Sequence, residues 1–365
     1  MSDQTIVITP PRTVWRQLRS GSFTTAGAYT AVLGIYTAVA APYLFSALGT
    51  VLGLYGIAVP AWWIHWPVGV WLEILGAGAA AVWLLALLDD SALMRQTGKA
   101  LRIMGCVLLL AVAGADAQGW MPGPAAGVVG PAAEIGLYLW LAAEVCSSHG
   151  IAPDRWLART PPRGRGRTAT AESVQVSALA ALVFSLTYFL LTALSHLPAP
   201  APRQDQTTAA SAGGMSAFLT QILWSAVVEE IVVTAAVATI LLLARRPLWE
   251  ILLASALMRA LPHLYLGLSL TLGVVVLGVA CAALYCRYRR ILPLVAAHLA
   301  YDLATVYLGP WMRPLAVLCA WGAIATLAVL AVLSILTPAS PARPGPAAPS
   351  VPKDLRDHSR ETEHA

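Results

Sequence analysis

Long apolar stretches, separated by short polar or basic segments, make up most of this 365-residue chain. A helix needs about 20 apolar residues to span the hydrocarbon core of a bilayer. The pattern predicts ten membrane-spanning helices, at residues 24–47, 68–88, 101–117, 125–146, 174–197, 215–244, 248–266, 268–286, 291–309 and 313–336. The first apolar region continues to Ile57, with Pro42 as a candidate kink. An eleventh crossing there would invert the orientation of everything downstream.

Composition supports an all-α, polytopic integral membrane protein. Hydrophobic residues make up 58% of the chain and charged residues 11%, whereas globular domains carry about 25% charged residues. The net charge of +5 is therefore interpreted as membrane topology, and no nucleic-acid partner is expected. The five cysteines lie in apolar stretches without metal-type spacing, which is typical of buried small hydrophobic residues. They are Cys106, Cys146, Cys281, Cys286 and Cys319.

The basic residues sort to one side of the predicted membrane. With the N-terminus in the cytoplasm and ten crossings, every one of the 23 lysines and arginines falls in a cytoplasmic segment except Arg203, Arg259 and Arg313. Cytoplasmic loops carry an excess of these residues, so both termini are predicted to be cytoplasmic. Arginine greatly outnumbers lysine, and Ala, Gly and Pro are abundant, which is typical of a GC-rich bacterial genome. We therefore expect a multi-pass protein of the bacterial plasma membrane.

Three polar segments divide the chain. Residues 1–23 form a cytoplasmic lead, residues 150–172 a basic Pro/Gly-rich cytoplasmic loop, and residues 338–365 a Pro/Ala-rich tail expected to be disordered. Between them lie a four-span region at 24–149, without an interpretable motif, and a six-span core at 173–337. The core holds nearly all the suggestive chemistry.

Six ionisable side chains interrupt three spans of this core. A charge at the bilayer centre costs on the order of 3 kcal/mol, so such residues are candidates for function. Counted at ~1.5 Å per residue, all six lie roughly 12 to 24 Å from the cytoplasmic ends of their helices. Within two of the spans a spacing of four residues places the members on one face. We expect all six to converge on one interior site. The set is Glu229, Glu230, Arg259, His263, His298 and Asp302.

The carboxylates Glu229 and Glu230 are adjacent in the stretch SAVVEEIVVT. Two carboxylates in an apolar interior need a nearby cation, and Arg259 is the candidate. A buried carboxylate that reaches water can serve as a general base. The alternative interpretation is structural, because a single intramembrane histidine is more often a packing residue than a catalyst. Structural or interfacial roles are also expected for three carboxylates in the first half of the chain, which are Glu73, Glu134 and Glu144.

The order and spacing of these residues resemble the CPBP family of intramembrane proteases, also called ABI, which includes the type II CAAX prenyl endopeptidases. That family has the motifs EExxxR, FxxxH and HxxxN/D on its core helices. Here Glu229-Glu230 begins the first motif, His263 in MRALPHLYLG is the histidine of the second, and His298 to Asp302 (HLAYD) matches the third. The resemblance covers about residues 215–309, and more loosely 174–336.

Two positions depart from the family pattern. Thr234 stands where the first motif has arginine, and Arg259 stands where the second has phenylalanine. Our hypothesis is that Arg259 supplies the positive charge missing at position 234 and contacts Glu230. The alternative is a catalytically degenerate member of the family.

The resemblance implies a role for each residue. Glu229 would activate a water for attack on a peptide carbonyl, and Glu230 would orient and tune it. His263 would assist that activation or bind the intermediate. His298 and Asp302 would form the oxyanion-binding side, unless Asp302 instead orients His298. Members are often labelled metalloproteases, and in a metalloprotease Glu229, His263 and His298 would be the zinc ligands. We favour a metal-free mechanism, because no HExxH motif is present.

The sequence thus predicts an intramembrane endopeptidase that cleaves a membrane-associated protein or peptide. A proton-coupled transporter is an alternative, since buried Glu, His and Arg also form proton relays. A non-catalytic scaffold or immunity partner is another. The identity of the substrate does not follow from the sequence.

Overall fold

The computed structural model describes residues 24–54, 56–58, 68–88, 98–117, 128–148, 169–197 and 215–336. Within these ranges the regular structure is helical. The first half contains α2 (Thr25–Leu54), α4 (Val68–Leu88), α5 (Lys99–Ala117) and α6 (Val129–Ser148). The second half contains α8 (Ala169–Ser195), α10 (Met215–Val227), η2 (Val228–Ala236), α11 (Val237–Leu243), α12 (Leu248–Ala260), η3 (Leu261–Leu266), α13 (Leu268–Tyr288), α14 (Leu292–Tyr307), η4 (Gly309–Trp311) and α15 (Met312–Leu336).

The helices confirm the all-α membrane class. Five helical segments in the described residues are long and apolar enough to cross a membrane: Val129–Ser147, Thr170–Ser195, Phe218–Leu243, Leu268–Tyr288 and Gly309–Leu333. Gly76–Leu88 and Leu292–Tyr307 are shorter apolar helices. Each of the ten predicted spans overlaps a helix, but the number of crossings, and with it the cytoplasmic orientation of the termini, stays a prediction.

Two predicted boundaries change. The first apolar region forms a single helix, α2, which continues through Pro42 to Leu54. Helix α8 begins at Ala169, so the end of the predicted loop 150–172 is helical and Glu172 lies in the first turn. An acidic residue is favourable there because it faces the positive end of the helix dipole. The predicted lead 1–23 and tail 338–365 lie outside the described residues, as does the rest of that loop.

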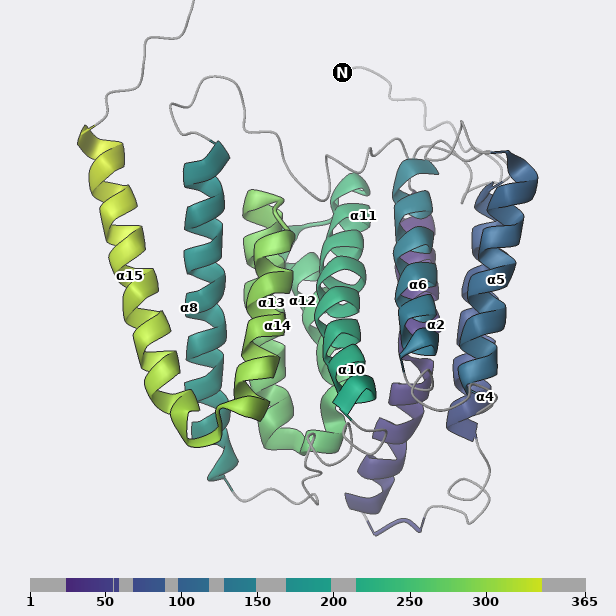
Figure 1. Cartoon of the computed structure of the whole chain (residues 1–365), viewed down its shortest axis with the longest axis horizontal. Coiled ribbons are helices and arrows are strands. Elements are labelled where there is room, and N and C mark those ends of the chain that lie inside the picture. Colours follow the sequence, from purple (N-terminus) through teal and green to yellow (C-terminus); the bar gives the residue numbers. More distant parts are fainter. Residues whose placement is uncertain are drawn as a thin grey trace, which may run out of the picture.

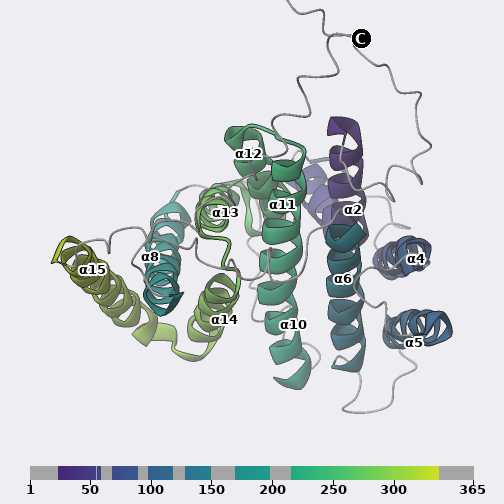
Figure 2. The ribbon, with the colours of Figure 1, turned by 90° about the horizontal axis from the view of Figure 1, so that it is seen from above.

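The continuous rod of α10, η2 and α11 lies at the centre of the molecule. Viewed from above, it separates α13 and α14 on one side from α2 and α6 on the other (Figure 2). Helices α8 and α15 extend the bundle beyond α13 and α14, and α4 and α5 flank α2 and α6 (Figure 1). The rod therefore presents side chains to both halves of the bundle.

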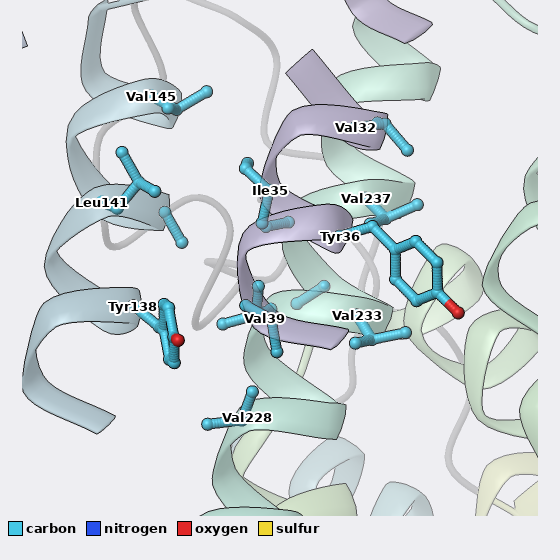
Figure 3. Packing of buried hydrophobic residues seen from close by; sticks show 14 of the residues in the cluster. Val32, Ile35, Tyr36, Val39, Tyr138, Leu141, Val145, Val228, Val233 and Val237 are labelled. Carbon is cyan, nitrogen blue, oxygen red and sulfur yellow. The ribbon is translucent and has the colours of Figure 1, made fainter. Parts of the chain in front are cut away.

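The contact between the rod and the first half is an apolar core. Valine, isoleucine, leucine and tyrosine side chains of α2 and α6 pack against the valines of η2 and α11 (Figure 3). The labelled members are Val32, Ile35, Tyr36, Val39, Tyr138, Leu141, Val145, Val228, Val233 and Val237. Helix α2 also packs against η3. The region without motifs thus supports two elements of the predicted site.

Small residues let α12 and α13 approach closely. A Cβ added at Gly278 of α13 would lie 2.8 Å from the Cα of Ala256 on α12. Real Cβ atoms essentially never come that near to a backbone atom, so position 278 requires glycine at this helix spacing. At Gly273 the added atom would instead meet the end of the flexible Leu191 side chain on α8.

A polar cluster ties α2 to the start of α12. The Tyr29 hydroxyl donates to Glu250 Oε2, which also accepts from Arg246 Nε at 2.7 Å. Arg246 Nη2 donates to Glu250 Oε1 at 2.6 Å, and its guanidinium lies over the Tyr29 ring. This cluster fixes the end of α12 that is remote from His263.

Candidate active site

The carboxylates Glu229 and Glu230 lie on a π-helical segment, η2, inside the central rod. Its sequence, VEEIVVTAA, is rich in β-branched residues, which crowd the backbone of a regular α-helix. π-Helical turns are rare and often occur at functional sites. The Ser255 hydroxyl of α12 donates to the Val233 carbonyl of this segment at 3.4 Å, a contact between the rod and its neighbour.

Arg259 is the centre of the charged cluster. Its Nη2 lies 2.5 Å from Glu230 Oε1 and 3.3 Å from Thr234 Oγ1, and its Nε lies 3.4 Å from Glu229 Oε2. The expected contact between Arg259 and Glu230 is therefore present. The guanidinium also reaches position 234 itself, so it occupies the neighbourhood that an arginine at that position would occupy.

His298 of α14 joins the cluster from the other side. Its Nδ1 lies 3.0 Å from Glu230 Oε1, and its Nε2 lies 3.5 Å from Asp302 Oδ2. A carboxylate only accepts hydrogen bonds, so Nδ1–H donates to Glu230. The Phe184 ring of α8 covers the imidazole, with ring centroids 5.3 Å apart. Two carboxylates and an aromatic ring thus fix the orientation of His298.

His263 occupies the short 3-10 helix η3 that follows α12. Pro262 disfavours continuation of the α-helix, because proline cannot donate a backbone hydrogen bond. His263 Nδ1 lies 2.7 Å from the Arg259 carbonyl, which leaves Nε2 directed to Glu229 Oε1 at 3.7 Å. The Thr271 hydroxyl donates to the His263 carbonyl at 3.1 Å, and Gly267, with φ +92°, provides the turn into α13.

Exposure divides the six residues into an inner and an outer layer. In the inner layer the side chains of Arg259 and Glu230 are 0% exposed and that of His298 is 7% exposed. In the outer layer Glu229 is 14%, His263 18% and Asp302 24% exposed. The structure thus brings all six predicted side chains together, with a buried, ion-paired inner layer beneath a partly exposed outer layer.

The described residues contain no group of three or more His, Cys, Asp and Glu side chains arranged to hold a metal ion. The zinc ligand set expected from the resemblance, Glu229, His263 and His298, does not fit in this arrangement. Both ring nitrogens of His298 are directed to carboxylates, those of Glu230 and Asp302.

Two residues that contact the site were not predicted from the sequence. The Ser225 hydroxyl of α10 donates to Glu229 Oε1 at 2.9 Å. The separation of four residues was a usable signal, because positions i and i+4 are neighbours on a helix. Phe184 lies on α8, which carries no motif, so nothing in the sequence pointed to its contact with His298.

This geometry defines a class of protein. Its members are all-helical membrane proteins with a buried cluster of carboxylate, guanidinium and imidazole groups. Residues 211–304 match the family described as Type II CAAX prenyl endopeptidase Rce1-like. The match covers η2 and η3, extends into α14 past Asp302, and confirms the family resemblance drawn from the three motifs. No curated protein and no solved structure matched the chain.

Proposed function

We propose that the protein is an intramembrane endopeptidase in which Glu229 activates water. The observation that carries this proposal is the outer layer, where a partly exposed carboxylate faces an imidazole across 3.7 Å. At separations above about 3.5 Å a water can bridge two polar groups. Glu229 Oε1 and His263 Nε2 are thus well placed to bind the attacking water.

The proposed reaction needs only this water and the peptide. Glu229 takes one proton as the water oxygen attacks the carbonyl carbon, and a C–O bond forms. The carbonyl oxygen becomes an oxyanion, which accepts from His298 Nε2–H in place of Asp302 when the imidazole carries both protons, while Glu230 holds the ring through Nδ1. The C–N bond then breaks, and the proton held by Glu229 passes to the leaving amine.

The inner layer serves this chemistry as a fixed support. Arg259 forms an ion pair with Glu230 and faces Glu229, and Glu230 holds the ring of His298. A site with donors already in place needs little rearrangement when charge develops in the reaction. Under this proposal Arg259 replaces the arginine that the family motif has at position 234.

We further propose a metal-free mechanism acting on a membrane-associated protein or peptide in a bacterial plasma membrane, with both termini in the cytoplasm. The contacts of His298 support the metal-free mechanism, since both of its ring nitrogens are directed to carboxylates. The apolar helices support a substrate that reaches the site from the bilayer or its surface.

The test is cleavage of a library of tagged membrane peptides by the purified protein in liposomes, read by mass spectrometry. Glu229→Gln and His298→Ala should abolish cleavage while leaving the protein folded. Glu144→Gln is the matched control, because this glutamate of α6 is buried outside the site and a glutamine can still accept from Trp140 Nε1. Unchanged cleavage by both site variants would overturn the mechanism. Absence of cleavage by the wild type across the library would favour the degenerate-member alternative.

A further inference from the structure

The hydroxyl of Ser225 makes a different hydrogen bond from those of five other serines and threonines on the described helices. Thr30, Ser185, Thr187, Thr192 and Thr326 each donate to the carbonyl four residues earlier in their own helix. This is the usual way in which a hydroxyl on a helix satisfies its donor. Ser225 instead donates forward, to the side chain of Glu229, at 2.9 Å.

The two oxygens of the Glu229 carboxylate are thereby held by different groups. Oε1 accepts from Ser225 at 2.9 Å and faces His263 Nε2 at 3.7 Å, whereas Oε2 faces Arg259 Nε at 3.4 Å. The Ser225 contact is the shortest of the three. It is also neutral, so it fixes the direction of Oε1 without adding a charge to the cluster.

Arg259 would otherwise draw the carboxylate toward itself. A guanidinium favours two parallel hydrogen bonds to one carboxylate, and here its Nε lies near Glu229 while its Nη2 is bonded to Glu230. If the Ser225 bond were absent, Glu229 could turn so that both oxygens approach Arg259. Oε1 would then move away from His263 and from the position proposed for the water.

We propose that Ser225 is a positioning residue, which holds Glu229 Oε1 toward His263 and against capture by Arg259. This inference rests on the proposed function and names a residue that is not part of the motifs. Ser225 lies in the last turn of α10, directly before the π-helical segment, so its place relative to Glu229 is set by the backbone of the rod.

The kinetic test compares Ser225→Ala with Ser225→Thr in the peptide-cleavage assay. Loss of a hydrogen bond to a charged group should lower kcat about 10- to 100-fold, with KM unchanged because the proposed role of Ser225 acts through Glu229 and not on the substrate. Threonine keeps the hydroxyl and should restore most of kcat. Ser185→Ala removes a hydroxyl that bonds within its own helix and is the matched control, with unchanged kcat. An alanine variant with wild-type kcat, or a threonine variant as slow as alanine, would overturn the proposal.

A second measurement does not depend on catalysis. Dicyclohexylcarbodiimide reacts with carboxyl groups in membrane proteins, and mass spectrometry reports the rate of labelling at Glu229. The rate should change in Ser225→Ala, return to the wild-type value in Ser225→Thr and stay unchanged in Ser185→Ala. If the wild type cleaves nothing, the proposed function fails and this labelling alone decides. Equal labelling of Glu229 in all four proteins would refute the positioning role.

Discussion

Removing the guanidinium of Arg259 should destabilise the protein more than any other single change in the cluster. The side chains of Arg259 and Glu230 are both 0% exposed, and Nη2 and Oε1 are 2.5 Å apart. Removing one member of a buried ion pair leaves the other charge unpaired, at a cost of about 3–5 kcal/mol. We expect this loss in the free energy of unfolding for Arg259→Leu.

Removing both charges should cost less than removing one. Buried ion pairs replaced by uncharged groups are often close to neutral in stability. The double variant Arg259→Leu/Glu230→Gln should therefore recover about 2 kcal/mol relative to the sum of the two single variants. Part of the loss will persist, because Glu229 also faces Arg259 at 3.4 Å.

The measurement is reversible unfolding in mixed micelles, followed by tryptophan fluorescence and extrapolated linearly to zero denaturant. Arg246→Leu serves as the control, because its ion pair with Glu250 is partly exposed, with 28% of the Arg246 side chain accessible, and its removal should shift the curve much less. The reasoning is refuted if Arg259→Leu unfolds like the wild type. It is also refuted if the double variant is as unstable as the two single losses added together.

Three further predictions follow from the same contacts. The double change Thr234→Arg/Arg259→Phe should restore part of the stability and cleavage lost in Arg259→Phe alone, because position 234 lies next to the guanidinium that pairs with Glu230. Failure to restore either property would count against the hypothesis that Arg259 replaces the arginine of the family motif. Gly278→Ala should lower the free energy of unfolding by about 1–3 kcal/mol, because the added Cβ would overlap the α12 backbone. Gly273→Ala should lower it less, because the flexible Leu191 side chain can move. Equal losses in the same assay would contradict this packing argument. Dialysis against a strong chelator should leave the cleavage rate unchanged, with no stoichiometric zinc by elemental analysis, and loss of activity restored by added zinc would contradict the metal-free mechanism.

The sequence predicted the meeting of the six polar side chains because that prediction needed only helix rise and the cost of charge in lipid. Depths counted along separate spans placed the glutamates, Arg259, His263 and His298 at overlapping levels, and the structure brings them into contact. The contact between Arg259 and Glu230 followed from the same count and from the missing arginine at position 234.

The local backbone of the site was less predictable. A run such as VEEIVVT has the same apolar pattern in an α-helix and in a π-helix, so its β-branched residues alone did not distinguish η2 from an α-helix. Pro262 was a signal for the end of α12, although the 3-10 helix that directs His263 toward Glu229 depends on tertiary contacts such as that of Thr271. The packing of α2 against η3 joins segments far apart in the chain, and no periodicity within either segment encodes it.

The position of Arg259 also bears on how the chain enters the membrane during synthesis. Glu229 and Glu230 leave the ribosome before their cation, and two unpaired carboxylates are costly in lipid. Only residues 244–247 separate α11 from α12, so the rod and α12 can enter the bilayer together as a helical hairpin. In that hairpin Arg259 already faces both carboxylates, and His298 is added when α14 follows. The short connection therefore lets Arg259 pair with the carboxylates during biogenesis, before the rest of the bundle has assembled.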